Sequence, residues 1–370
     1  MQSIELNAVV TFVPKSNGNM KKIALLFVAC SLAFAANATI RTVNNVNGLE
    51  ADHTTISDAI AASVDGDTIY VQPSPNSYGS FGLNKRLVIM GAGHNPSFSP
   101  YESYITQVTF VTGSGNSVLK GLSIQIIASS SGVICNNVVI SGCKLVNSSD
   151  SPILMGDATH NGWILEGCIL QSGNSQPIKL LNFDANLIIR NCYAMSQGAY
   201  NLFNSAPSGT LIDHCILLTL GTSTYTGIAT GQNILHTNNI VTTDASLNYG
   251  VDYSCSFCTH NNNLLWNSNS SFSTPPSGSG NIVNADPLFL NFYFSSSYVY
   301  TWDFHLANNS LANNAGTDGS DIGIYGGIFN FNHYGIDGGS PHIVDFTLGS
   351  SSAPQGGTIT IHINANGSGQ

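Results

Sequence analysis

The sequence predicts an all-β protein that folds as a right-handed parallel β-helix, a solenoid of stacked coils, with a short capping helix near its N-terminus. Three observations lead to this fold class. A motif of two or three aliphatic residues, a polar pair, a small residue and a further aliphatic residue recurs in steps of 21 to 25 residues. Only 8% of the residues are charged while 42% are hydrophobic, which suits short strands better than helices or a disordered chain. A short segment with one apolar helical face precedes the repeats.

Residues 20–38 have the three parts of a secretory signal peptide. Lys21 and Lys22 form a positively charged start, Ile23–Phe34 form an apolar run too short to cross a bilayer, and an Ala-Asn-Ala cleavage site follows. We therefore expect residues 1–19 to be an upstream extension. The protein is expected to leave a bacterial cell and to be secreted, periplasmic or held at the cell surface. No later segment is long and apolar enough to predict a membrane span.

The capping helix is predicted just before the first strand of the solenoid. Ile56, Ala59 and Ile60 are spaced so that they share one face of a helix. Thr54 or Thr55 precedes this segment and is a suitable N-cap residue. A helix at this point would cover the open end of the β-helix and protect its exposed edge.

The β-helix itself is expected to span residues 39–340. Each coil cannot bury its apolar face alone, so neighbouring coils stack about 4.8 Å apart and equivalent residues form columns. The columns three residues before and two residues after the small residue are aliphatic and are predicted to point inward. Cysteines in the small-residue column are then core residues and not a disulfide framework. That column is read as Leu122, Cys143, Cys168, Cys192, Cys215, Asn238 and Asn263.

Two cysteines outside this column, Cys255 and Cys258, form a C-x-x-C pair. The second pair that a zinc site needs is missing, and so is the context of a thioredoxin motif. We predict a local disulfide or two buried thiols, in preference to a metal or redox site.

The C-terminal residues 341–370 contain two alternating segments on either side of a turn rich in Gly and Pro. Thirty residues are too few for a stable domain of their own. They are predicted to form a β-hairpin cap or the start of a truncated accessory β-domain.

Several segments together resemble one family. HTTISDAIAASVDGDTIYVQPSPNSYG and LNKRLVIMGAG lie near the N-terminus, and ADPLFL and DFHLANNSLANNAGTDGSDIGIYGG lie near the C-terminus. This arrangement resembles exported bacterial right-handed parallel β-helix proteins of the pectate-lyase-like superfamily. The resemblance implies the fold and the capping helix. It leaves the chemistry open, because that superfamily includes lyases, hydrolases, epimerases and non-catalytic adhesins.

A polar column lies two residues before the small-residue column and carries the candidate catalytic residues. A ladder of alternating charges on the surface is one interpretation. An active site is the other, with two carboxylates two coils apart as acid and base. The arginine between them would keep both ionised, which favours the ladder. The candidates are Glu166, Arg190, Asp213 and His236.

A second candidate surface is aromatic. Tyr298, Tyr300, Trp302 and Phe304 alternate along the chain and would share one face of a strand. Such a face can stack on sugar rings, so Tyr298, Tyr300 and Trp302 are candidate substrate-binding residues. The alternative is that these rings plug the C-terminal end of the solenoid, and the need to cover that end favours the plug.

Charge and ligand patterns narrow the range of partners. The chain has 10 Lys and Arg against 20 Asp and Glu, which makes nucleic acid an unexpected partner. No cofactor or metal is predicted, although Asp318 and Asp321 could ligate calcium. His214, His236 and His260 differ in register and are read as solvated turn residues.

We therefore expect an exported monomer that binds a polysaccharide or a cell-envelope glycan through its lateral face. The first alternative is a polysaccharide lyase or glycoside hydrolase with a degenerate pectate-lyase-like site. The second is a purely structural surface protein.

Overall fold

The structure is a computed structural model. It describes residues 38–97, 99–173, 178–183, 186–198, 201–221, 224–225, 227–248, 250–251, 255–272, 274–329, 331–335, 342–348 and 361–366. The chain divides into two units, residues 1–38 and 39–370, and the second carries the elements described below. The predicted upstream extension and all but the last residue of the predicted signal peptide lie outside the described residues.

The predicted capping helix is present as α2 (Ile56–Ala62). Thr55 is its N-cap, and the Thr55 hydroxyl accepts a hydrogen bond from the backbone N–H of Asp58 at 3.1 Å. Ile56, Ala59 and Ile60 are buried, as their spacing predicts. The helix contacts the strands of the first coils, so its apolar face extends the solenoid core.

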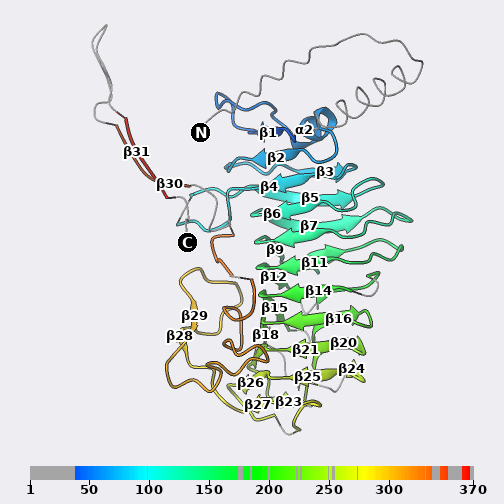
Figure 1. Ribbon diagram of the computed structural model, residues 1–370, viewed down its shortest axis with the longest axis vertical. Helices are drawn as coiled ribbons and strands as arrows, with labels where there is room; N and C mark the ends of the chain where they lie inside the picture. Colours follow the sequence, from blue (N-terminus) through cyan, green and yellow to red (C-terminus); the bar gives the residue numbers. More distant parts are fainter. Residues whose placement is uncertain are drawn as a thin grey trace, which may run out of the picture. The chain divides into compact units, whose positions relative to one another are not determined.

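Two long parallel sheets run along the stack of coils (Figure 1). Sheet A has ten strands: β1 (Ile40–Val43), β2 (Thr68–Val71), β4 (Val88–Met90), β6 (Val118–Lys120), β8 (Val139–Ser141), β11 (Ile164–Glu166), β14 (Ile188–Arg190), β17 (Leu211–Asp213), β21 (Leu235–Thr237) and β25 (Thr259–Asn261). Sheet B consists of β3 (Ser80–Leu83), β5 (Tyr104–Phe110), β7 (Ser123–Ser129), β9 (Lys144–Asn147), β12 (Ile169–Ser172), β15 (Tyr193–Gln197), β18 (Ile216–Leu220), β22 (Ile240–Thr243), β26 (Leu264–Asn267) and β27 (Ile282–Val283), with β10 (Ile153–Leu154) paired to β7.

Shorter strands complete the coils. Sheet C is a parallel sheet of β13 (Ile178–Lys179), β16 (Asn201–Ala206), β20 (Gly227–Gln232) and β24 (Cys255–Ser256). β19 (Thr224–Tyr225) pairs in parallel with β23 (Leu247–Asn248). Each coil thus adds a strand to a neighbour that precedes it by about one repeat, so the predicted fold class, a parallel β-helix, is confirmed.

A single residue in the left-handed backbone region joins sheet A to sheet B in seven consecutive coils. Only Gly and, less often, Asn adopt this conformation at low cost, which explains the second residue of the polar pair in the repeat motif. His214 is the one larger residue in the column and has φ of 49°. We call this column the corner column; it consists of Gly121, Gly142, Gly167, Asn191, His214, Asn238 and Asn262.

The solenoid core contains the predicted columns. The four cysteines Cys143, Cys168, Cys192 and Cys215 are buried free thiols, as predicted. The aliphatic column before them is fully buried and consists of Leu119, Ile140, Leu165, Ile189 and Ile212.

The sequence alignment of the sixth repeat is wrong by one residue. Strand pairing places His236 opposite Ile212 and Thr237 opposite Asp213, so Asn239 continues the cysteine column in place of Asn238. Two adjacent asparagines were equally suitable for that position. A slip of one residue exchanges the inner and outer faces of a strand. His236, predicted in the outward polar column, therefore points into the core.

A second core lies on the outer face of sheet B. The hairpin of β28 (Phe289–Asn291) and β29 (Asp303–Leu306) and the chain around it pack there (Figure 1). Trp302 and Phe304 are 1% and 2% exposed. They contact Tyr193, which points outward from β15. The prediction that these aromatic residues plug the end of the solenoid is therefore wrong, because they cover its side.

After this hairpin the chain runs back along the corner column. Asn262 donates a hydrogen bond from Nδ2 to the carbonyl of Ala315 at 2.7 Å. One coil back, Asn238 donates to Thr317 Oγ1 at 3.0 Å and accepts from the Thr317 N–H at 2.8 Å. Further back, Asn191 donates to the carbonyls of Ile324 and Gly326. Residues 315–326 are thus hydrogen-bonded to successive coils through asparagine side chains of the corner column. The same asparagines are favoured there because they tolerate the left-handed backbone conformation.

The two predicted C-terminal strands are present as β30 (His342–Leu348) and β31 (Ile361–Asn366), which pair antiparallel.

Candidate functional site

The predicted polar column lies at the ends of three neighbouring strands of sheet A. Glu166, Arg190 and Asp213 end β11, β14 and β17 and are paired in register. Arg190 holds Glu166 through two contacts with Oε2, at 2.6 Å from Nη2 and 3.1 Å from Nε. Both side chains keep partial exposure, 26% for Arg190 and 13% for Glu166. This is the geometry of a surface ion pair, worth about 0–1 kcal/mol.

Asp213 is engaged by three neutral or weakly basic neighbours. It accepts from Thr237 Oγ1 at 2.6 Å and from Asn238 Nδ2 at 3.0 Å, and His214 Nδ1 lies 3.0 Å from its other oxygen. Burial acts to raise the pKa of Asp213, but the hydrogen bonds from His214 and Thr237 outweigh it and lower that pKa. A general acid needs a raised pKa, so this environment suits a permanent carboxylate.

His236 does not join this column. It is fully buried and stacks on His260, with ring centroids 4.4 Å apart and planes inclined by 16°. Burial lowers its pKa well below the ordinary value, and His260 adds to this. An imidazole in this position cannot contact a polysaccharide outside the solenoid.

The reading of three histidines as solvated turn residues is also wrong. His214, like His236 and His260, is at most 1% exposed. Its Nε2 lies 3.1 Å from the hydroxyl of Ser320, in the segment that covers the corner column. The three imidazoles are structural groups inside the protein.

Of the three aromatic candidates, only Tyr298 and Tyr300 keep partial exposure, while Trp302 is buried in the second core. Tyr298 packs edge-on against Tyr193, 5.0 Å between centroids. Tyr300 lies where this aromatic cover ends and the open part of sheet B begins.

Tyr300 is the centre of a polar cluster. Its hydroxyl donates to the carbonyl of His94 at 2.6 Å, and His94 Nδ1 completes the pair at 3.0 Å, which requires that Nδ1 carries the proton. Lys144 Nζ lies over the Tyr300 ring, 5.6 Å from its centroid. The same Nζ pairs with Glu102 at 2.7 Å. Burial raises the pKa of Tyr300, so its hydroxyl stays protonated.

Polar side chains continue from this cluster across the open, N-terminal part of sheet B. Tyr104 donates from its hydroxyl to Gln125 Oε1 at 3.0 Å, and Gln107 donates to Thr109 Oγ1 at 2.8 Å. All four are half-buried, so each presents part of its surface to solvent. We call this surface the polar terrace; it consists of Glu102, Tyr104, Gln107, Thr109, Gln125, Lys144 and Tyr300.

The sequence contained a signal for this terrace that repeat alignment alone did not reveal. Along one outward column of sheet B the residues are Tyr104, Ser123, Lys144, Ile169 and Tyr193. Beyond Lys144 the column turns apolar and is covered. A change from polar to apolar residues in an outward column marks where an uncovered face ends.

The two candidate calcium ligands, Asp318 and Asp321, accept hydrogen bonds from residues close to them in the sequence. Asp318 accepts hydrogen bonds from the N–H and hydroxyl of Ser320, and Asp321 accepts from the N–H of Asn314. Within the described residues, no three His, Cys, Asp or Glu side chains converge on a common point where a metal ion could be held.

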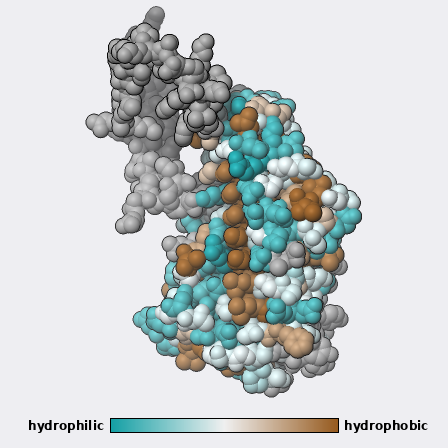
Figure 2. All heavy atoms as spheres, turned by 45° about the vertical axis from the view of Figure 1, so that its right-hand side comes forward, coloured by the Kyte–Doolittle hydropathy of each residue, from teal (hydrophilic) through white to brown (hydrophobic). Residues whose placement is uncertain are grey.

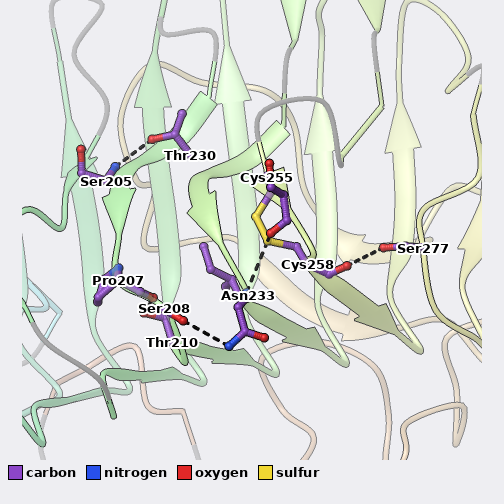
Figure 3. The surroundings of a disulfide bond; sticks show 11 residues. Ser205, Pro207, Ser208, Thr210, Thr230, Asn233, Cys255, Cys258 and Ser277 are labelled. Atoms are coloured by element: carbon purple, nitrogen blue, oxygen red, sulfur yellow. Dashed lines mark hydrogen bonds between the residues drawn. A yellow bond between two sulfur atoms is a disulfide. The ribbon is translucent and has the colours of Figure 1, made fainter.

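Cys255 and Cys258 form a disulfide, one of the two states predicted for them (Figure 3). Cys258 Sγ accepts the N–H of Ile234 at 3.4 Å, and the Cys258 carbonyl accepts from Ser277 at 2.7 Å. The bridge therefore closes the corner between β24 and β25 and is tied to the coils on both sides.

Among the residues that the structure describes, no helix has the length and apolarity needed to span a membrane.

No family model matches this sequence, and no curated protein matches it significantly. Among solved structures the chain is similar to pectate lyase Pel9A, with 16% sequence identity, a TM-score of 0.47, and 81% of this chain and 98% of that chain covered. It is similar to a pectin methylesterase from Aspergillus niger, with 14% identity, a TM-score of 0.39 and coverages of 73% and 95%. A pectin methylesterase variant in complex with a hexasaccharide gives 10% identity, a TM-score of 0.33 and coverages of 66% and 93%. Its own strand pairing makes this chain a parallel β-helix protein.

Proposed function

We propose that the protein binds a polysaccharide on the polar terrace of sheet B. The observation that carries this proposal is the cluster of Tyr300, Lys144 and Glu102 at one border of an otherwise uncharged surface. Sugar sites combine a few fixed polar groups with an aromatic or apolar surface. The terrace offers amide and hydroxyl groups for sugar hydroxyls, and the Tyr300 ring offers an apolar contact.

The charges of the terrace favour a glycan over other polymers. Lys144 and Glu102 neutralise each other at 2.7 Å, so the terrace carries no net charge from this pair. The whole chain has a formal charge of −10, and a nucleic acid would be repelled. The strands are regularly spaced at about 4.8 Å per coil, so an extended polysaccharide could contact several coils at once.

Hydrogen bonds among the terrace residues pre-organise them. Tyr104 is fixed by Gln125, Gln107 by Thr109, and Tyr300 by His94. Side chains already held in place lose little further entropy when a ligand binds. This supports binding as the function and gives each residue a defined role as donor, acceptor or stacking surface.

The test is a binding screen of the full-length protein on neutral and uronate polysaccharides, with calcium and with a chelator. Affinity electrophoresis reports binding, and absorbance of unsaturated ends and reducing-sugar assays report cleavage. We expect retention by at least one glycan without product. Accumulating product would show that the protein is an enzyme. If a glycan were retained only in the presence of calcium, Asp318 and Asp321 would again be candidate calcium ligands.

Variants locate the site. Gln125→Ala and Lys144→Ala should weaken binding about tenfold each, since each loses one or two hydrogen bonds worth about 1–1.5 kcal/mol. Gln232→Ala is the matched control, because Gln232 is an exposed glutamine on β20 of sheet C. Equal binding by all three variants would reject the terrace as the site.

Export through residues 20–38 is part of the same proposal, because a polysaccharide partner lies outside the cell. The expected result of expression in a bacterial host is a processed chain that begins near Thr39 in the periplasm or medium. N-terminal sequencing of the fractionated protein checks this, and an unprocessed cytoplasmic chain would contradict it.

A further inference from the structure

A continuous stripe of aliphatic side chains runs along the outer face of sheet A. It is formed by the first residue of seven successive strands, all exposed in part: Val88, Val118, Val139, Ile164, Ile188, Leu211 and Leu235. Figure 2 shows an unbroken line of hydrophobic surface along the stack of coils. At about 4.8 Å per coil the stripe is about 29 Å long.

This stripe differs from the apolar part of sheet B. There the outward residues Tyr193, Ile216 and Ile240 are buried under the second core. The stripe remains open, and its last member Leu235 is 39% exposed. Soluble proteins seldom leave an extended apolar strip uncovered unless a partner covers it.

The stripe is flanked on one side by the charged column of Glu166 and Arg190. Consider a second copy of the chain placed face to face on sheet A by a two-fold axis that lies along the strand direction, midway between β11 and β14. Ile164 then meets Ile188 of the second copy. Glu166 faces Arg190 of the second copy, and Arg190 faces Glu166, so the two charges nearest the axis meet their opposites, while Asp213 faces the hydroxyl of Ser141.

The other flank of the stripe matches under the same axis. It is a column of turn residues two positions before the stripe: Asn116, Asn137, Gly162, Asn186, Gly209 and Asn233. Across the two-fold, Gly162 faces Asn186 and Asn137 faces Gly209. In these two central pairs the longer side chain meets a glycine, while Asn116 faces Asn233 further from the axis. The central pairs allow the two sheets to approach to the usual separation of about 10 Å.

We infer that the outer face of sheet A is a self-association surface, on which a second copy of this chain docks antiparallel with its stripe on the first. A parallel axis midway between β14 and β17 would pair Arg190 with Asp213 of the second copy and leave Glu166 opposite Thr237. The charge-exchange experiment below distinguishes that axis, because it predicts no rescue when the Glu166 and Arg190 variants are mixed. An axis along the solenoid would place Glu166 opposite the uncharged turn column. The inference is independent of glycan binding, because the polar terrace lies on sheet B.

The contact is narrow, one apolar residue wide with polar flanks. Interfaces at the low end of the usual size range, about 1,200 Å² in total, give weak and reversible complexes. The expected dimer therefore has a micromolar dissociation constant. Sedimentation velocity of the full-length protein between about 1 and 300 µM should show a concentration-dependent shift from monomer to dimer.

A charge-exchange experiment tests the proposed geometry. Glu166→Arg alone and Arg190→Glu alone each place like charges across the axis, so each protein should stay monomeric over the same range. Mixed in equal amounts they should associate again. In the mixed pair, the arginine introduced at position 166 faces the glutamate introduced at position 190 of the other variant. Misfolding of either variant cannot produce such rescue.

An apolar test accompanies it. Ile188→Glu should abolish association, whereas Ile134→Glu, at a residue that is 61% exposed outside the stripe, should leave it unchanged. A monomer at all concentrations, or charge variants that associate like the parent and show no rescue, would overturn the inference. Loss of glycan binding in Ile188→Glu without any change of mass would assign the stripe to a glycan and also overturn it.

Discussion

Cys215 and Asn239 occupy equivalent positions in successive coils, and the backbone N–H of Cys215 donates to Asn239 Oδ1 at 2.9 Å. In earlier coils a thiol takes the place of that amide: the N–H of Cys192 donates to Cys215 Sγ at 3.4 Å. Asn239 also donates to the Ile212 carbonyl at 2.9 Å, as Cys215 does to Ile189 at 3.6 Å. One core column thus changes from cysteine to asparagine without changing its hydrogen-bond pattern.

This equivalence predicts the cost of substitutions at Asn239. Asn239→Ala leaves the Cys215 N–H buried without a partner and removes one of the bonds to the Ile212 carbonyl, so it should lower the free energy of unfolding by about 1–3 kcal/mol. Asn239→Cys restores a weaker donor and acceptor and should cost less than half as much. Urea unfolding measures both, with Asn309→Ala at an exposed turn as the control. Equal losses for Ala and Cys would contradict the equivalence.

Buried histidines make the fold sensitive to acid. Burial, aided by the charge of Lys144, lowers the pKa of His94 to about 3, and burial also lowers the pKa of His236. In the unfolded chain these groups titrate near 6.5. Between the two values the unfolded state binds more protons, so stability is complete above about pH 6.5 and falls as the pH decreases.

His94 alone should cost about 2 kcal/mol at pH 5, since each unit below 6.5 corresponds to about 1.4 kcal/mol. His236→Leu, which restores the aliphatic column of Ile212, should flatten the decrease between pH 7 and pH 5. Urea titrations at the two pH values measure it, and His305→Leu, 60% exposed at its side chain, is the control. A decrease of the same size in parent and His236→Leu would show that His236 does not contribute.

Trp302 is predicted to be a structural residue. Its ring packs against Tyr193, Phe292 and Tyr298 in the second core. Trp302→Ala should therefore lower the free energy of unfolding by about 3–5 kcal/mol, as is usual for a buried aromatic residue. Tyr293→Ala, at a residue that is 53% exposed, should cost far less. Thermal unfolding measures the stability of both variants. If Trp302→Ala kept its stability but lost glycan binding, Trp302 would be a binding residue and not a structural one.

The fold could be predicted from sequence because its signals are local and repeated. Each signal can be recognised within a few residues of sequence. The signals are the Gly or Asn at each corner, the aliphatic residues of each repeat and the N-cap residue Thr55. The Glu166–Arg190 ladder follows from register alone. The one error of register arose at Asn238 and Asn239, where two identical residues compete for one position.

The position of the candidate site could not be predicted in the same way. It depends on where the cover formed by residues 285–329 and Phe331 ends on sheet B, which is a contact between distant parts of the chain. Tyr300 and His94 are separated by 206 positions in the chain and meet through two hydrogen bonds. The strands under the cover are buried on both faces, as in β18, where all five residues are buried and four are apolar. Such runs indicate a covered sheet, without naming the segment that covers it.

The most direct test of glycan binding at the polar terrace is hydroxyl-radical footprinting of the full-length protein with and without the polysaccharide that it retains best. The proposal predicts that Tyr104 and Tyr300 become protected, while Tyr101, 48% exposed and not a terrace residue, keeps its reactivity. Unchanged reactivity of Tyr104 and Tyr300 under saturating glycan, with protection elsewhere on the solenoid, would contradict it.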